Sequence, residues 1–165
     1  MKAVSNTTPL RYLIAINQEQ LLGKLFEKVF VPVAVHEELT DARTPEAVRR
    51  AVSSLPEWFE MRSVEPSDTS TFPAPLHRGE REAILLAEAL RVDVLLMDEQ
   101  TGRNVALSRN LPLSGTLGIL ERADTMKLIT NFPVVLQNLK ISGFFIAPIL
   151  EQQLLRRHFA RQQRK

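Results

Sequence analysis

Acidic residues recur along this chain of 165 residues, where an apolar strand is followed by a helix or where a helix begins. In a parallel sheet, the residues at the carboxyl ends of the strands face one crevice, and ligands bind there. Carboxylates gathered in such a crevice repel one another unless a cation or a proton lies between them. The pattern therefore predicts a site for a hard metal ion. The acidic segments are residues 31–39, 79–87 and 92–99, and residues 5–7 add polar side chains after the first strand.

The elements that must position these residues alternate between strands and helices. The run at 92–97 is nearly continuously apolar, which is typical of a central parallel strand covered on both faces. Alternating strands and helices predict a three-layer α/β/α sandwich with a central parallel sheet. The predicted strands are 2–5, 29–31, 58–64 (an edge strand), 92–97 and 111–116. The predicted helices are one capped by Asn6 or Thr7, then 18–26, 32–39, 46–52, 79–90, 98–108, and two or three of 117–126, 133–141 and 148–162.

Chain length and the remaining segments predict the domain organisation. A chain of this length suits one domain, residues 1–165, with a basic C-terminal helix at about 148–165. That basic end is suited to binding RNA or docking a partner, although a solubilising helix end is the commoner explanation. The prolines and hydroxyl residues of 65–77 predict a surface loop, mobile and near the site.

Composition excludes several classes of function. The chain has no cysteine, which excludes disulfides, thiolate metal sites and cysteine nucleophiles. It shows no leader and no apolar run of membrane-spanning length, so we expect a cytoplasmic protein with no membrane partner. The net charge of +2 does not by itself indicate a nucleic-acid binder. The three histidines are scattered and are expected at the surface, and no serine has the partners of a nucleophilic triad.

Five short motifs, in this order, resemble those of one family. They are Ser5-Asn6-Thr7-Thr8-Pro9-Leu10, Pro32-x-Ala34-Val35-x-x-Glu38-Leu39, Gly79-Glu80-x-Glu82-Ala83-Ile84-x-Leu86-Ala87, Leu95-x-Met97-Asp98 with Gly102-Arg103, and Gly115-Thr116-Leu117-Gly118. Together they resemble the PIN-domain proteins, and within them the toxin branch close to VapC. The resemblance extends from the first strand to about Ile119.

The resemblance implies a Mg2+- or Mn2+-dependent ribonuclease that cleaves single-stranded RNA, the toxin of a toxin–antitoxin pair. Carried over by position, the residues that hold the metal and act in catalysis are Asn6, which replaces the usual first aspartate, and the acids Glu38, Glu82 and Asp98. Glu80 is an alternative to Glu82. A small antitoxin and a homodimer are implied as partners. The fourth acid often found after the last strand has no counterpart in residues 114–116.

Simpler interpretations exist for each of these positions. Asn6 and Asp98 suit helix caps, and acids at a helix start are favoured by the helix dipole whatever the function. These interpretations do not explain why all four positions fall at one predicted end of the sheet. Arg103, one helical turn beyond Asp98, is a weaker candidate for contact with a substrate phosphate. Two rival functions stay open. The first is a catalytically weak or silent PIN scaffold that binds RNA or protein. The second is a small-molecule or phosphoacceptor domain, which is less favoured because this chain has no glycine-rich loop after the first strand.

Overall fold

The computed structural model describes residues 1–54, 56–65, 72–73 and 75–164, and within them five parallel strands form one sheet. The strands are β1 (Lys2–Ser5), β2 (Lys28–Pro32), β3 (Phe59–Arg62), β4 (Val94–Leu96) and β5 (Leu113–Ser114). Their order across the sheet is β3-β2-β1-β4-β5, so β3 lies at an edge, as predicted. The parallel sheet and its helices confirm the predicted α/β class.

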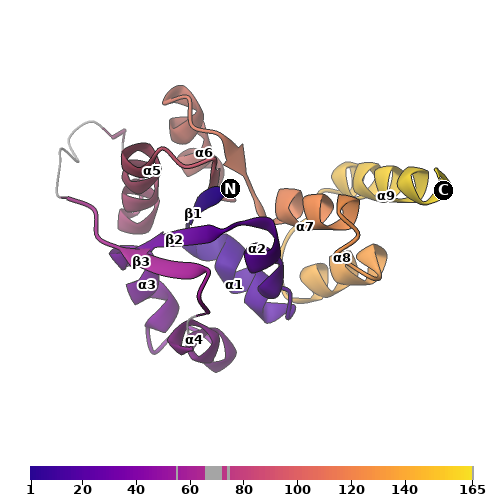
Figure 1. Ribbon diagram of the computed structural model, residues 1–165, viewed down its shortest axis with the longest axis horizontal. Helices are drawn as coiled ribbons and strands as arrows, with labels where there is room; N and C mark the ends of the chain where they lie inside the picture. Colours follow the sequence, from indigo (N-terminus) through magenta and orange to yellow (C-terminus); the bar gives the residue numbers. More distant parts are fainter. Residues whose placement is uncertain (55, 66–71, 74, 165) are drawn as a thin grey trace.

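Helices cover both faces of the sheet (Figure 1). The helices α1 (Thr7–Ala15), α2 (Gln20–Leu25), α3 (Val33–Thr40) and α4 (Glu46–Ser53) share one core cluster, and α5 (Arg78–Leu90) and α6 (Gln100–Ser108) share another. Successive strand residues point to opposite faces. Ala3 therefore lies in the first cluster and Val4 in the second, and Leu96 and Leu95 divide in the same way. This division explains why β4 is apolar along its whole length.

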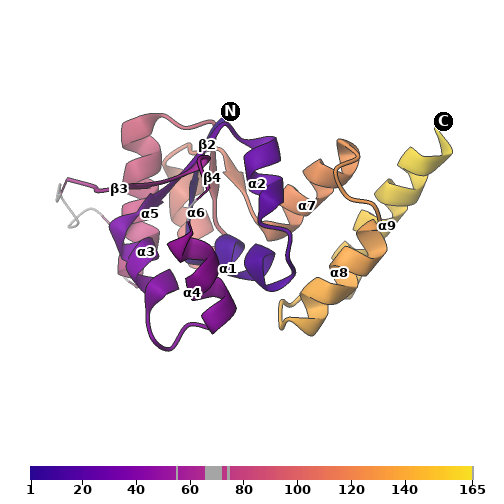
Figure 2. The ribbon, with the colours of Figure 1, turned by 60° about the horizontal axis from the view of Figure 1, so that its bottom comes forward.

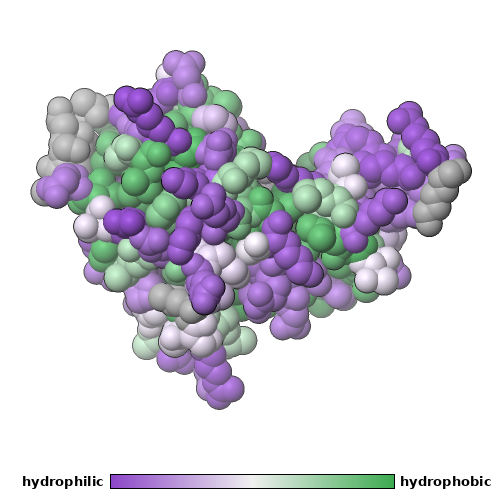
Figure 3. All heavy atoms as spheres, in the orientation of Figure 1, coloured by the Kyte–Doolittle hydropathy of each residue, from purple (hydrophilic) through white to green (hydrophobic). Residues whose placement is uncertain are grey.

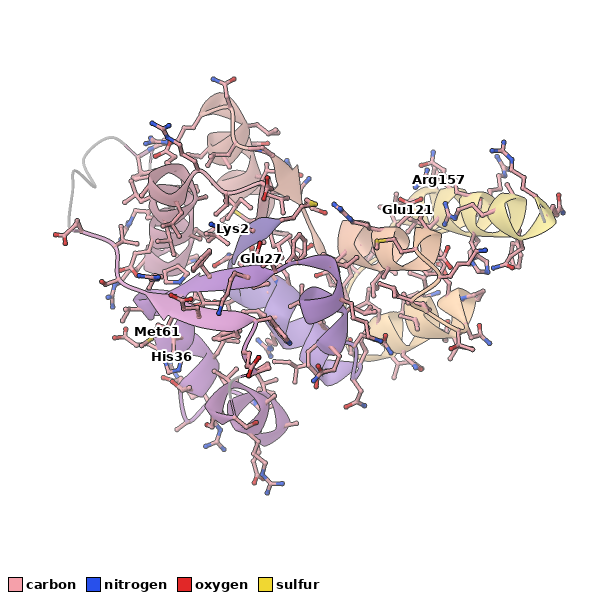
Figure 4. The ribbon with its side chains drawn as sticks, in the orientation of Figure 1. Lys2, Glu27, His36, Met61, Glu121 and Arg157 are labelled. Carbon is pink, nitrogen blue, oxygen red and sulfur yellow. The ribbon has the colours of Figure 1, made fainter. Side chains whose placement is uncertain are left out.

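The C-terminal helices α7 (Thr116–Thr125), α8 (Phe132–Ile141) and α9 (Pro148–Gln163) follow β5. Figures 1 and 2 show α8 and α9 lying beyond α7, away from the sheet. In Figure 4, Arg157 of α9 lies beside Glu121 of α7, and their side chains form an ion pair with an N–O distance of 2.5 Å. Part of the basic charge predicted for this end of the chain thus holds α9 against α7.

One prediction about the histidines is wrong. His158 is only 8% exposed, and its Nδ1 lies 2.9 Å from an oxygen of the buried Asp124. Arg161 donates a hydrogen bond to the other oxygen of Asp124, at 2.5 Å. The helical spacing of His158 and Arg161 brings both to one carboxylate of α7, which no local sequence pattern indicates.

Element boundaries shift by a few residues from the predicted ones. The helix predicted from Asp98 begins at Gln100, and the strand predicted at 111–116 is limited to Leu113–Ser114. Of the loop predicted at 65–77, residues 66–71 and 74 lie outside the described residues. Within the described part of the chain, no helix is both long and apolar enough to cross a membrane.

Candidate active site

The sheet brings the end of β1 and the end of β4 together. Ser5 pairs with Leu96, and the backbone N–H of Asn6 donates to the carbonyl oxygen of Leu96 at 2.9 Å. On the other side of β4, the N–H of Met97 donates to Ser114 at 2.9 Å. Three carboxyl ends of strands therefore lie side by side. The residues that follow them face one edge of the sheet, as the sequence predicts.

Asn6 follows β1, the middle strand of the sheet, and its side chain does not cap α1. It is 3% exposed, and its Nδ2 donates to Glu99 Oε2 at 3.0 Å. The hydroxyl of Thr8 donates to the other oxygen of Glu99. Both oxygens of the Glu99 carboxylate are thus held by the junction between β1 and α1. The cap interpretation of the Asn6 side chain finds no support in this geometry.

Sequence reasoning did not select Glu99. The only local signal is its position directly after Asp98, where one of two neighbouring acids must take the inner place. Neither residue type nor spacing says which of the two does so. The contact with Asn6 spans 93 positions in the chain and depends on the pairing of β1 with β4.

Glu38 lies on the same junction from another direction. The hydroxyl of Thr7 donates to Glu38 Oε2 at 2.5 Å. The other oxygen, Oε1, lies against the start of α5, because a Cβ atom on Gly79 would be only 2.6 Å from it. Glycine at position 79 therefore permits the close approach of α5 to this carboxylate. Glu38 and Glu99 together contact the three-residue segment 6–8.

The two alternative acids of α5 point to different places. Glu80 is 5% exposed, and its Oε2 accepts a hydrogen bond of 2.9 Å from the N–H of His77. Its Oε1 lies toward α6, at 2.9 Å from where a Cβ atom on Gly102 would stand. The Glu80 side chain therefore lies between the start of α5 and α6, the helix that follows Glu99.

Glu82 lies at the start of α3 instead. Its Oε2 accepts a hydrogen bond of 3.0 Å from the N–H of Ala34, and its Oε1 accepts one of 2.8 Å from Arg78 Nε. A carboxylate is favoured at this place because the first N–H groups of a helix have no partner within the helix. The described contacts join Glu82 to α3, which carries Glu38, and they do not join it to Asn6.

Asp98 holds the start of α7. The backbone N–H of Thr116 donates to Asp98 Oδ1 at 2.8 Å, and the hydroxyl of Thr116 donates to Oδ2 at 2.6 Å. Burial raises the pKa of the Asp98 carboxyl group, and the two hydrogen bonds from Thr116 oppose this rise. Repulsion from the neighbouring Glu99 adds to it. Arg103 lies close by, but its Nη1 donates to the carbonyl oxygen of Met97 at 2.7 Å.

The four predicted site residues thus share one edge of the sheet but form separate contacts. Asn6 meets Glu99, Glu38 meets Thr7, Glu82 meets Ala34, and Asp98 meets Thr116. Among the residues that the structure describes, no group of three or more acidic or histidine side chains is placed to hold one metal ion. The acids are held apart by hydrogen bonds from hydroxyl, amide and backbone groups.

A pocket of about 380 Å³ adjoins Glu38 and is lined by both acids and arginines. Arg78 pairs with Glu37 at 2.8 Å across this pocket. Arg43 pairs with Asp41, and its hydrogen bonds lower the pKa of Asp41 to about 2. The two pairs leave the pocket with little net charge, so it gives no strong attraction for an anion.

Comparison with known proteins identifies one family. A sequence profile of the PIN domain matches residues 2–159, which is nearly the whole chain. No curated protein matches the chain.

Proposed function

We propose that this chain, which belongs to the PIN-domain family, is a metal-dependent endoribonuclease that cleaves single-stranded RNA. PIN domains are generally nucleases, and they generally use divalent metals. The observation that carries the proposal is the convergence of Glu38 and Glu99 on the segment 6–8 at the carboxyl edge of the sheet. Glu80 lies beside the helix that follows Glu99 and adds a further carboxylate to this edge.

The donor set fits a hard cation that the protein and its substrate bind together. Magnesium prefers oxygen ligands, keeps several waters, and is held in many enzymes by one or two carboxylates plus a substrate phosphate. Glu38 and Glu99 supply such carboxylates, and they would hold Mg2+ or Mn2+ with the amide oxygen of Asn6. A preformed cage of three acids is not needed for this mode of binding. When bound, the cation supplies charge neutralisation at the phosphate and a more acidic water.

The chain's own residues then have distinct tasks. Thr7 and Thr8 orient the two carboxylates through their hydroxyl groups. Asp98 fixes the start of α7 through Thr116, so it supports the edge next to Glu99. We retain Glu82 and Asp98 as candidate metal ligands, carried over from the family. The geometry of Glu80 and Glu99 supports a role as metal ligand better. Arg103 remains the candidate for phosphate contact.

A second candidate function is a catalytically silent scaffold that binds RNA or protein. One observation favours it: the Asn6 amide and the Thr8 hydroxyl already satisfy both oxygens of Glu99 without a cation. An aspartate at position 6 would instead repel Glu99 and so require a cation or a proton between them. The amide therefore removes part of the drive to bind metal.

Cleavage of a labelled, generic single-stranded RNA in Mn2+ or Mg2+ separates the two functions. We expect cleavage by the wild-type protein and its loss in Glu38→Gln and Glu99→Gln, which keep the side-chain shape and remove the charge. Glu46→Gln is the matched control, because Glu46 is an exposed acid of α4 paired with Arg50. A wild type that binds RNA and does not cut it in either metal supports the silent scaffold instead.

The role as a toxin is proposed from the family resemblance alone. In that role a small antitoxin protein would bind the chain, and a homodimer would be the resting form. Exposed apolar side chains on the C-terminal helices, including Ile141 and Phe159, offer surface for such partners. Growth arrest on expression of the wild type, and growth with Glu38→Gln, is the expected result. Equal growth with both proteins would refute the toxin role and leave the ribonuclease proposal standing.

A further inference from the structure

A groove of about 570 Å³ opens beside the candidate active site. One wall of the groove is the start of α6, with Gln100 and Arg103, and its floor is the turn from β5 into α7. The opposite wall is the segment that joins α8 to α9 and includes Phe145. Figure 3 shows the molecular outline hollowed between the part that holds α6 and the part that holds α9. The groove includes Asp98 and so begins one residue from Glu99.

Phe145 is presented to solvent by an anchored segment. The side chain is 82% exposed, whereas Ile146 after it is 6% exposed. Phe144 before it packs edge-on against Tyr12, with ring centroids 5.0 Å apart. The chain enters this segment through Gly143, whose φ of +100° favours glycine. The backbone on both sides of Phe145 is thus fixed by packing, and the ring is held outward.

The facing wall carries polar groups held in place. The guanidinium of Arg103 is fixed by its hydrogen bond to the carbonyl oxygen of Met97, and within the described residues the Arg103 side chain makes no other hydrogen bond. Gln100 donates from Nε2 to Asn104 at 2.7 Å, and the described residues donate no hydrogen bond to its side-chain oxygen. The groove therefore combines an exposed aromatic ring, a positioned cation and a free amide acceptor.

This combination matches an unpaired nucleobase. A base has a flat π face that stacks on aromatic side chains, and a polar edge that forms hydrogen bonds with amides. The phosphate next to it favours a guanidinium. The volume falls within the roughly 300–1,000 Å³ typical of ligand pockets. A double helix does not offer these faces, because its bases are stacked and paired.

We propose that this groove binds one unpaired base of the RNA, with Phe145 stacked on the base and Arg103 facing the adjoining phosphate. The inference rests on the proposed function, because it assigns the groove to the strand that reaches Glu99. It places substrate selection for single strands on the segment between α8 and α9, apart from the residues that would hold a metal.

The test compares binding of a short labelled oligouridine with binding of an abasic oligonucleotide of the same length, without divalent metal. Phe145→Ala should weaken binding of the oligouridine by roughly 5- to 150-fold, the range for loss of one base stack. Its binding of the abasic strand should stay unchanged, and Phe145→Trp should keep wild-type affinity for both. Ile141→Ala is the control, because Ile141 is 74% exposed and does not line the groove.

Three results would overturn the inference: no binding of oligouridine by the wild type, equal effects of Phe145→Ala on both strands, or an effect matched by Ile141→Ala. A wild-type dimer that dissociates on Phe145→Ala without a change in oligouridine affinity per chain would assign Phe145 to a protein interface instead. Cleavage of RNA in Mn2+ is measured separately. A wild-type protein that does not cleave RNA but shows base-dependent binding would refute the proposed function. The assignment of an unpaired base to the groove would then still stand.

Discussion

Replacing Asn6 by aspartate tests the contact on which the candidate site depends. Asn6 Nδ2 lies 3.0 Å from Glu99 Oε2, so a second carboxylate at position 6 would meet the first at about this distance. At an effective dielectric constant of about 20, two unit charges 3.0 Å apart repel by roughly 5–6 kcal/mol. The buried position of Asn6 leaves little room for water to screen this repulsion.

Protonation sets a limit to the destabilisation. Keeping an ordinary aspartic acid protonated at pH 7 costs about 4 kcal/mol, because its usual pKa is about 3.9 and each pH unit above it costs about 1.4 kcal/mol. This is less than the repulsion, so the folded, metal-free variant should hold one proton between the two groups. We expect a loss of about 3–4 kcal/mol in the free energy of unfolding at pH 7, or roughly 6–16 °C in Tm for a chain of this size.

The same pair should respond to pH and to metal. The introduced carboxyl group has a folded-state pKa above its unfolded value, so the lost stability should return as the pH falls toward 4. A divalent cation between two carboxylates replaces the proton, so saturating Mn2+ should raise the Tm of Asn6→Asp more than that of the wild type. Cleavage should also rise if the missing charge limits metal binding.

Thermal melts at pH 7 and pH 4, with and without Mn2+, measure these effects. Asn104→Asp is the matched control, since Asn104 is an exposed residue of α6 and accepts a hydrogen bond that aspartate also accepts. The control should change stability by less than about 0.5 kcal/mol. An Asn6→Asp protein with the control's Tm and the wild type's response to Mn2+ would refute the contact between positions 6 and 99.

Three further predictions concern the neighbouring acids. Thr116→Val removes the hydroxyl that donates to Asp98 and should lower the free energy of unfolding by about 1–3 kcal/mol in urea titration, whereas Thr116→Ser should not. Burial raises the pKa of the Asp98 carboxyl group above its ordinary value of 3.8. The contribution of Asp98 to the free energy of unfolding is therefore greatest below pH 3.8 and is lost as the pH rises through the raised pKa. Asp98→Asn should flatten this part of the Tm-versus-pH curve. Glu80→Gln should reduce metal-dependent cleavage more than Glu82→Gln, and equal loss in both would contradict the inner position of Glu80.

The sequence by itself determined the type of sheet and the edge at which the candidate site lies. The apolar run that forms β4 needed helices on both faces, and alternating strands and helices required a parallel sheet. Parallel strands carry their following residues to one edge, so Asn6 and the acids after β4 had to lie at the same edge of the sheet. These conclusions rest on local patterns and on general rules of strand connection, and they hold whatever the side-chain contacts are.

Only the tertiary structure decided which acid of each adjacent or nearby pair faces inward. Glu99 meets Asn6 because β1 pairs with β4, whereas Asp98 is directed to Thr116 by the pairing of β4 with β5. Glu80 and Glu82 divide in the same way between α6 and α3. The direction of a side chain beyond a strand end or on the first turn of a helix depends on the N–H and hydroxyl groups that distant segments place around it. Those groups come from residues up to 93 positions away, and no local spacing encodes them.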